Sequence, residues 1–169
     1  DPRCERFEDS PPCPINHYGR GKVEAENRIR ESDIGWTILR ACPLGFNRHH
    51  NRGLVNWAIQ SLKEGRQVTG FADSSFTPLS AATLARMLAS VGDDESGKIL
   101  HFISSPPISK YDFLKTAARI LGAPETLVTK GSIQNAKFTA PRPRRQDLQT
   151  REPKKRIFAI ERELEASLT

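Results

Sequence analysis

The pattern of polar and apolar positions predicts helices and strands in the order of an α/β protein. A charged, helical run over residues 17–31 is followed by a short turn and then by the apolar run 36–41. This run is apolar on both faces rather than alternating, which is typical of an interior strand in a parallel sheet that helices cover on both sides. Helix, turn and buried strand in this order make half of a βαβ unit.

Apolar residues at helical spacing predict further helices beyond residue 53. Ser80 is placed to cap the second of them, and Ser109 with Asp112 approximates a capping box for the third. The stretch 123–156, rich in proline and basic residues, is assigned no element. The expected buried stripes are Val55, Ala58, Ile59 and Leu62; Leu84, Met87, Leu88 and Val91; Leu114, Ala117, Ala118 and Leu121; and, in a closing helix, Ile157, Ile160, Leu164 and Leu168.

Strand candidates besides 36–41 are few, namely 67–71, 76–79 and 98–104. An interior strand needs neighbours on both edges, and an unpaired one is an aggregation liability. We therefore expect further strands upstream of Asp1, in a longer chain from which this one is cut. The polar residues 42–52 predict a loop at the carboxyl end of the buried strand, where open α/β sheets place their ligands.

Composition sets limits on the setting and on the partners. The 169 residues suit a single domain on length alone. No apolar run approaches a membrane span and no signal peptide is present, so no membrane partner is expected. The three cysteines show no metal-ligand spacing, which favours a reducing, cytoplasmic setting without a metal site. The net charge of +6 permits an anionic partner without choosing its kind.

Two polar segments invite functional interpretations. The paired histidines His49 and His50 suggest a metal, but no acidic residue or cysteine stands at ligand spacing, so a solvated loop is favoured. The stretch 137–156 holds eight Lys and Arg residues and a single aromatic residue, Phe138. Nucleic-acid binding would need interleaved aromatic residues for stacking, so no nucleic-acid partner is expected. A solvated loop and a contact with a pyrophosphate through arginine forks both stay open.

The spacing Tyr-x-x-x-Lys, which occurs twice, places both side chains on one face of a helix, one turn apart. Tyr18 and Lys22 form the first pair, and Tyr111 and Lys115 form the second. A given tyrosine meets such a lysine by chance roughly once in ten cases, so spacing alone is weak. Tyr111 lies in the first turn of an ordinary amphipathic helix, which favours packing. Tyr18 begins the helix that leads into the buried strand, and its role is left open by the local sequence.

A resemblance favours a catalytic role for Tyr18. The runs YGRGKVEAE, WTILRACPLGFN, GFADSSFTPLSAATLARML, ISKYDFLKTAARILG and APRPRRQDLQT resemble, in order and spacing, the extended short-chain dehydrogenase/reductases. More narrowly they resemble the dTDP-4-dehydrorhamnose reductase branch, which reduces a sugar nucleotide. The similarity extends from about Pro11 to Thr150 and corresponds to the C-terminal two-thirds of such enzymes.

The resemblance implies the C-terminal part of an NAD(P)-binding Rossmann sheet plus a small α/β substrate domain, with the N-terminal strands missing. Residues 1–65 would belong to the Rossmann part, and 66–169 to substrate-domain elements and closing helices interleaved with it. The implied reaction is reduction of a 4-keto sugar nucleotide by NAD or NADP, and a homodimer stays an option. By motif, the implied site residues are Tyr18 and Lys22 as catalytic pair and cofactor contacts, Ala41, Cys42 and Pro43 beside the nicotinamide, and Asn47, Phe76 and Arg142 at the substrate cleft.

The chemistry suits these residue types. Reduction of a ketone leaves an alkoxide that must take up a proton, and a tyrosine phenol with an ordinary pKa of about 10 can supply it. An ammonium group one turn away favours the phenolate and brings the pKa of the phenol closer to operating pH, where general acid catalysis works best. The same lysine can hold the ribose of the cofactor, which carries the hydride chemistry.

The chain departs from the family pattern in two respects. The glycine-rich phosphate-binding turn is absent, and the family's Ser/Thr partner of the catalytic tyrosine has no counterpart. We therefore expect this chain alone to be inactive and to bind no dinucleotide tightly. Two other functions stay open. One is a non-catalytic relative that binds a partner, as the regulatory β subunit of methionine adenosyltransferase does; the other is a sugar-nucleotide epimerase or dehydratase.

Overall fold

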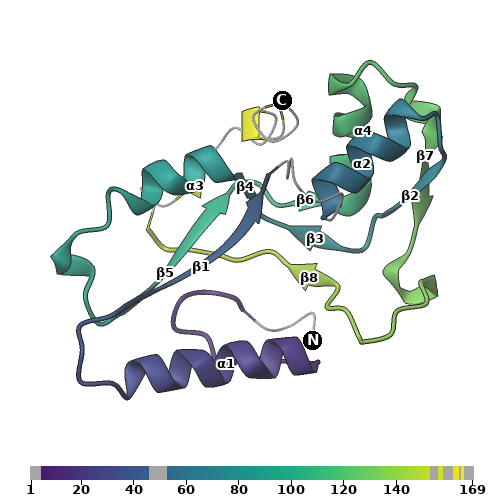
Figure 1. Ribbon diagram of the computed structural model, residues 1–169. Helices are drawn as coiled ribbons and strands as arrows, with labels where there is room; N and C mark the ends of the chain where they lie inside the picture. The colour runs from purple at the N-terminus through teal and green to yellow at the C-terminus, as the bar shows by residue number, and fades with distance from the viewer. Residues whose placement is uncertain (1–4, 46–52, 153–155, 158–161, 164, 166–169) are drawn as a thin grey trace.

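A four-stranded parallel sheet forms one half of the computed structural model, which describes residues 5–45, 53–152, 156–157, 162–163 and 165. The strands follow the spatial order β4-β1-β5-β9. Figure 1 shows β1 and β5 side by side at the centre of this half, with helices above and below. The bounds are β1, Thr37–Leu44; β4, Pro78–Ser80; β5, Lys98–Ser104; and β9, Arg156–Ile157.

The interior strand predicted over 36–41 is confirmed, although it is longer than expected. β1 pairs with β5 from Thr37 to Ala41, and its last residues, Cys42–Leu44, pair with β4. The expectation of a loop from residue 42 is therefore wrong for Cys42–Leu44, because β4 supplies a parallel partner for this end of the strand. The rest of the expected loop, including Asn47, His49 and His50, lies outside the described residues apart from Gly45.

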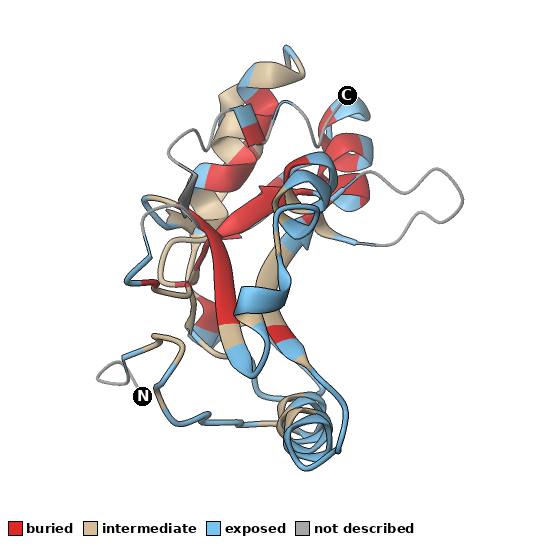
Figure 2. Ribbon diagram, turned by 90° about the vertical axis from the view of Figure 1, so that its left-hand side faces the viewer, coloured by how far each residue is buried: buried red, intermediate tan, exposed pale blue. Residues whose placement is uncertain are grey.

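Helix α1 (His17–Arg30) covers one face of this sheet without burying any of its residues. It begins where the predicted charged run begins, because the Asn16 side chain accepts a hydrogen bond from the Gly19 amide at 2.8 Å. Its main contact with the sheet is polar. Glu26 accepts two hydrogen bonds from the Arg40 guanidinium of β1, at 2.8 and 2.6 Å. Figure 2 shows α1 at the bottom of the molecule as an almost wholly exposed helix.

Helix α3 (Ala81–Leu88) lies on the other face, as Figure 1 shows. Ser80 caps it as predicted, accepting from the Thr83 amide. Part of the predicted stripe is confirmed: Leu84, Met87 and Val91 pack against the core formed by Leu79, Leu100 and Phe102. Leu88 is 47% exposed and does not belong to the stripe.

The other half of the molecule is built on helices α2 (Leu54–Lys63) and α4 (Lys110–Ile120) and the parallel pair β2 (Val68–Phe71) and β7 (Val128–Gly131). The predicted stripes of both helices are confirmed, except that Leu121 is only partly buried. β2 comes so close to α4 that a Cβ at Gly70 would lie 2.5 Å from the Tyr111 Cα, so only glycine fits there. The buried core is Leu44, Val55, Ala58, Ile59, Leu62, Val68, Phe76, Phe113, Leu114, Ala117, Ala118 and Val128.

A small three-stranded sheet joins the two halves. Its order is β6-β3-β8, with β6 (Ile108–Ser109) antiparallel and β8 (Arg145–Gln146) parallel to β3 (Ser75–Phe76). The strand expected over 76–79 is thus wrong as one element, because Phe76 belongs to this sheet and Pro78 begins β4. The described part of the chain also contains three short 3₁₀ helices: η1, Asp93–Glu95; η2, Glu125–Leu127; and η3, Ile133–Asn135.

The C-terminal third differs most from expectation. The stretch 123–156, which was assigned no element, contains β7, β8 and the first residue of β9. Ile157 belongs to β9, paired with Ser104 of β5, and does not begin a closing helix; Ile160, Leu164 and Leu168 lie outside the described residues. The division of the chain at residue 65 stays a prediction. None of the helices that the structure describes is long and apolar enough to cross a bilayer.

Candidate functional site

The predicted catalytic pair stands on the exposed surface of α1. Tyr18 is 75% exposed, and the Lys22 amine lies 5.6 Å from the centroid of its ring, one turn further along. Neither side chain makes a hydrogen bond or an ion pair with another described residue. The structure confirms the shared helical face that the spacing predicts, and both polar groups are free to contact a ligand.

The start of α1 is tied to the arginine-rich segment that follows residue 140. Asn16, the residue that caps α1, donates a hydrogen bond from Nδ2 to the carbonyl oxygen of Pro141 at 2.9 Å. Arg142 comes next in the chain, and its guanidinium lies 5.7 Å from the Phe138 ring. The helix of Tyr18 and the segment of Arg142, far apart in the sequence, are therefore neighbours in space.

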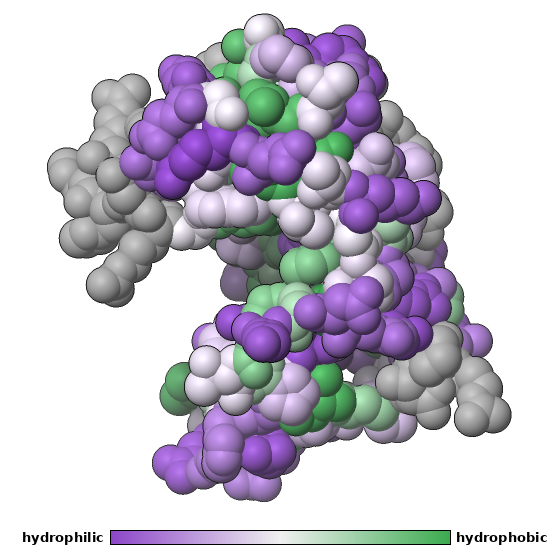
Figure 3. Space-filling view, turned by 90° about the vertical axis from the view of Figure 1, so that its right-hand side faces the viewer, coloured by the Kyte–Doolittle hydropathy of each residue, from purple (hydrophilic) through white to green (hydrophobic). Residues whose placement is uncertain are grey.

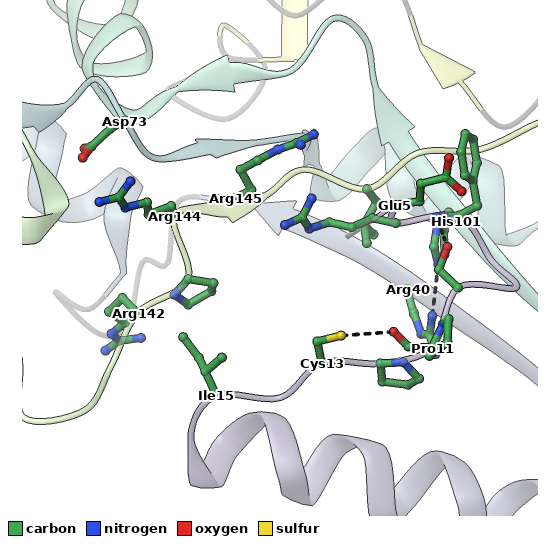
Figure 4. A pocket seen from close by; sticks show the side chains of 16 residues that line it. Glu5, Pro11, Cys13, Ile15, Arg40, Asp73, His101, Arg142, Arg144 and Arg145 are labelled. Atoms are coloured by element: carbon green, nitrogen blue, oxygen red, sulfur yellow. Dashed lines mark hydrogen bonds between the residues drawn. The ribbon is translucent and has the colours of Figure 1, made fainter. Parts of the chain in front are cut away.

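A cavity of about 630 Å³ opens beside this junction, between the lead-in segment 5–15 and the segment 142–148. Figure 4 shows arginine side chains reaching toward it from opposite sides, with Arg142 and Arg144 on one side and Arg40 on the other. Its lining residues are Glu5, Arg6, Phe7, Ser10, Pro11, Pro12, Cys13, Ile15, Arg40, Asp73, His101, Arg142, Pro143, Arg144, Arg145 and Leu148.

Two guanidinium groups of this cavity carry uncompensated charge. Within the described chain, Arg142 and Arg144 have no carboxylate at ion-pair distance. Asp73 lies on the same side of the cavity as Arg144 in Figure 4. The Ser132 hydroxyl and, more weakly, the positive charge of Arg144 hold the pKa of Asp73 below its usual range. The cavity can therefore take a compact anion, for which paired guanidinium groups are suited donors.

Arg145, by contrast, is fixed in the fold. Its guanidinium donates to the buried carboxylate of Asp147 at 2.6 Å, and the Ser75 hydroxyl donates to the same carboxylate at 2.7 Å. Burial raises the pKa of Asp147, but these hydrogen bonds outweigh it and leave the pKa below its usual range. This cluster anchors the segment that carries Arg142 and Arg144 to β3.

His101 and Arg40 line the inner part of the cavity and contact each other there. His101, which has no exposed surface, lies with Nδ1 2.8 Å from the Gln149 carbonyl oxygen and Nε2 3.4 Å from Nη1 of Arg40. The Gln149 carbonyl can only accept and the Arg40 guanidinium can only donate, so Nδ1 of His101 donates and Nε2 accepts; burial lowers the pKa of His101. Arg40 in turn holds Glu26 of α1. The position of α1 is thus set by the floor of the cavity.

The segment expected beside a nicotinamide forms the last residues of β1. Ala41 and Cys42 are half-buried there, and Pro43 is exposed. Burial raises the pKa of the Cys42 thiol. The space-filling view shows this side of the molecule deeply hollowed, between the part with α1 and the part with α2 and α4 (Figure 3).

The predicted site residues do not all lie around the same cavity. The cavity is lined by Arg142 but not by Tyr18, Lys22 or Ala41–Pro43. Phe76 has no exposed surface, because it packs edge-on against Phe113 with their centroids 5.7 Å apart. The structure therefore gives Phe76 a packing role in place of the substrate contact that the resemblance implies. Asn47 lies outside the described residues.

Sequence reasoning missed His101, Arg40 and Arg144 as site residues. Arg144 belongs to the basic stretch that was noticed, so its signal was present but shared with seven other cations. His101 and Arg40 stand in the middle of strands, where neither burial nor partners can be read from neighbouring residues. Their roles come from Glu26 and Gln149, which belong to other elements.

The chain is 28% identical, over 141 residues, to the probable low-salt glycan biosynthesis reductase Agl14 of Haloferax volcanii, covering 82% of this chain and 47% of that protein. The chain thus spans about half the length of this curated relative.

Two solved structures share the fold. A dTDP-4-dehydrorhamnose reductase from Yersinia enterocolitica superposes with a TM-score of 0.82 at 21% identity, over 98% of this chain and 60% of that one. A dTDP-4-dehydrorhamnose reductase from Bacillus anthracis, solved in complex with NADP, gives 0.82 at 22% identity, over 98% and 59%. The chain therefore has the Rossmann-like α/β fold of these two enzymes. Residues 5–169 match the family described as the RmlD substrate binding domain, and the chain belongs to that family.

Proposed function

We propose that this chain is part of an NAD(P)-dependent reductase acting on a 4-keto sugar nucleotide. One observation carries the proposal. A tyrosine and a lysine, free of other partners, stand together on an exposed helix whose capping residue donates a hydrogen bond to the arginine segment beside a cavity of about 630 Å³. Its relatives bear the names of sugar-nucleotide and glycan reductases, which supports the same reaction.

Tyr18 has the role of proton donor. A carbonyl that accepts a hydride becomes an alkoxide, and the Tyr18 hydroxyl protonates it. The resulting phenolate faces the positive charge of Lys22, whose amine lies 5.6 Å from the ring centroid. Proton transfer by a well-placed side chain accelerates a reaction about 10²–10⁴-fold.

A nicotinamide cofactor supplies the hydride when it is bound. The residues present fit such a group, because Tyr18, Lys22 and Pro43 are exposed and Ala41 and Cys42 are half-buried in the second half of β1. Lys22 would hold the ribose, and Ala41–Pro43 would lie against the ring. The Bacillus anthracis relative was solved with NADP, and either NAD or NADP suits these residues.

Arg142 and Arg144 hold the diphosphate of the sugar nucleotide in this proposal. Their guanidinium groups have no carboxylate partner within the described residues, so a diphosphate would gain charge-assisted hydrogen bonds without breaking an existing ion pair. Arg145 does not take part directly, because Asp147 already occupies it. It acts as a support for its two neighbours.

The test is the substitution Tyr18→Phe in the complete protein, with the upstream residues restored. We expect kcat for reduction of dTDP-4-dehydrorhamnose to fall about 10²–10⁴-fold, with the Kd for NADPH changed less than threefold. Tyr111→Phe, at the second pair, serves as the matched control and should retain turnover. Unchanged turnover in Tyr18→Phe would remove Tyr18 from its role.

A second measurement concerns the chain as given. Isothermal calorimetry should show no tight binding of NADPH, because the glycine-rich turn that holds a pyrophosphate is not in this sequence. A dTDP-sugar should bind weakly through Arg142 and Arg144. Tight NADPH binding would contradict our expectation that this chain alone binds no dinucleotide tightly.

A further inference from the structure

Lys110 is a mostly buried amine that the proposed reaction does not use. It is the first residue of α4, following the capping residue Ser109. Its Nζ lies 3.1 Å from the centroid of the Phe76 ring, and Phe76 itself has no exposed surface. An ammonium group in such a place is held by the ring face on one side and by little else.

The charge of this amine is not balanced by the chain. Among the described residues no carboxylate lies within ion-pair distance of Lys110, and no hydrogen bond is formed by its Nζ. The Cys42 thiol is the titratable group that acts on it. Burial lowers the pKa of Lys110 to about 8. A cation–π contact offsets only part of the cost of burying an unpaired charge.

The amine lies at the ligand-binding end of the sheet. Cys42 is two residues beyond Arg40 in β1, and side chains two apart share one face of a strand. Arg40 contacts Glu26 of α1, so Cys42 and the amine beside it are on the α1 side of the sheet. Because β1 ends at Leu44, they stand at the carboxyl end, where open parallel sheets bind ligands.

We propose that Lys110 is a binding residue for an oxyanion, a phosphate or carboxylate carried by a ligand that lies over the carboxyl end of β1. The anion supplies the counter-charge that the fold leaves out, and the Phe76 ring holds the amine in place for it. The site is separate from the arginine cavity, which Lys110 does not line. The inference holds whether or not the complete protein is a reductase.

The pH dependence of oxyanion binding follows from the positive charge of the protonated Lys110 amine. The oxyanion binds the protonated amine, so binding raises the pKa of Lys110 back toward its ordinary value of about 10.4. Above pH 8 the free chain loses this proton, and the dissociation constant should rise about tenfold for each pH unit until the pKa of the complex is reached.

The experiment is an NMR titration of the chain labelled with ¹³C at lysine Cε, with Lys110→Arg used to assign the resonance. The probes are inorganic phosphate, UDP-glucuronate and UDP-glucose. We expect the titration midpoint of Lys110 to move upward with phosphate or with UDP-glucuronate. A response to UDP-glucuronate and not to UDP-glucose assigns the anion to a sugar carboxylate; equal responses to all three assign it to phosphate.

Variants test whether the charge is responsible. Lys110→Met should weaken binding of the responding probe at least tenfold, and Lys110→Arg should retain most of it. Lys115→Met is the matched control, because Lys115 lies on the same helix but is paired with Glu125 at 2.8 Å. A Lys110 midpoint that none of the probes moves, or unchanged affinity in a folded Lys110→Met chain, would overturn the proposal.

Failure of this inference and failure of the proposed function give different results. Nucleotide sugars that bind in a manner sensitive to Arg142→Ala, without moving the Lys110 midpoint, would leave the reductase proposal intact and overturn the Lys110 site. Phosphate that moves the Lys110 midpoint while no nucleotide sugar binds would do the reverse.

Discussion

Helices α1 and α4 carry the same tyrosine–lysine spacing in opposite surroundings. On α1, Tyr18 is 75% exposed and the helix buries no residue. On α4, Tyr111 packs against the core, and the helix buries Phe113, Leu114, Ala117 and Ala118. Lys22 faces its own tyrosine ring at 5.6 Å, whereas Lys115 is bound to Glu125. The spacing sets only where the two side chains stand on a helix; the rest of the fold decides what they can touch.

The contrast also separates stability from function. α4 repeats apolar residues at helical spacing because the core requires them. α1 has no such requirement, and it is held by polar contacts at Asn16 and Glu26. A tyrosine that is not used for packing is available for chemistry. The following predictions test this division, and the largest effect comes first.

The largest expected effect on stability is at Phe113 of α4. Phe113→Ala removes a ring with no exposed surface that packs against Phe76, and should lower the free energy of unfolding by about 3–5 kcal/mol. Tyr18→Ala on α1 should change it by less than about 0.5 kcal/mol, as exposed substitutions do. Urea unfolding followed by circular dichroism measures both. A similar loss of unfolding free energy in the two variants would show that α1 is packed in solution. The contrast between α1 and α4 would then be wrong.

The next effect is at Asp147, which anchors the segment that α1 depends on. The pKa of Asp147 is lowered in the folded chain. Its contribution to stability is therefore fully present above the unfolded pKa of about 3.9 and is lost as pH falls through the lower folded value. Asp147→Asn should cost about 1.5–3 kcal/mol at pH 7, as loss of hydrogen bonds to a charged group does.

The pH profile distinguishes this cause from simple mispacking. The difference between Asp147→Asn and the parent chain should shrink as pH is lowered toward 2, because the parent carboxylate is then protonated too. Asp112→Asn, at the exposed cap of α4, serves as control. A difference that is constant from pH 7 to pH 2 would mean that the charge of Asp147 is not what holds Arg145.

The fold could be predicted from the sequence where local patterns decide it. The charged run of α1, the cap Ser80 of α3, the stripes of α2 and α4 and the strand β5 are read from neighbouring residues, since caps and periodicity act within a few positions. Two of the short strands, β7 and β8, could not be predicted in this way. Val128–Gly131 is a strand because Val68–Phe71 lies beside it, and Arg145–Gln146 because Ser75–Phe76 does.

The candidate site shows the same limit. Tyr18, Lys22 and Arg142 come from motifs, and the structure places Tyr18 and Lys22 on one exposed face and Arg142 at the neighbouring cavity. His101 and Lys110 could not be found, because what makes each unusual is burial against residues of other elements: Arg40 and Gln149 for His101, Phe76 for Lys110. Phe76 was misjudged for the same reason, since a motif does not show how deeply a side chain lies.

The caps provide a smaller test, because one anchors α1 and the other α4. Asn16→Ala and Ser109→Ala each remove an acceptor for a backbone N–H and should cost about 1 kcal/mol. Asn16→Asp keeps the acceptor but cannot donate to Pro141. It should therefore retain stability while loosening the arginine segment, which faster amide exchange at residues 142–144 would reveal. Unchanged exchange would mean that the Asn16–Pro141 hydrogen bond does not couple α1 to the cavity.

The smallest expected effect is at the two lysines themselves. Lys115 is bound to Glu125, which holds the pKa of Lys115 above its usual range, but the pair is open to water and screened by salt. Neither Lys115→Met nor Lys22→Met should shift the urea midpoint measurably. In the complete protein the two variants should differ, with kcat/KM falling more than tenfold for Lys22→Met and staying near the parent value for Lys115→Met. Because the two changes are chemically identical and neither affects folding, a difference in rate can come only from what each lysine faces. Equal kcat/KM values in the two variants would show that exposure on α1 does not distinguish a catalytic tyrosine–lysine pair. The catalytic role proposed for Tyr18 would then be supported by its motif alone.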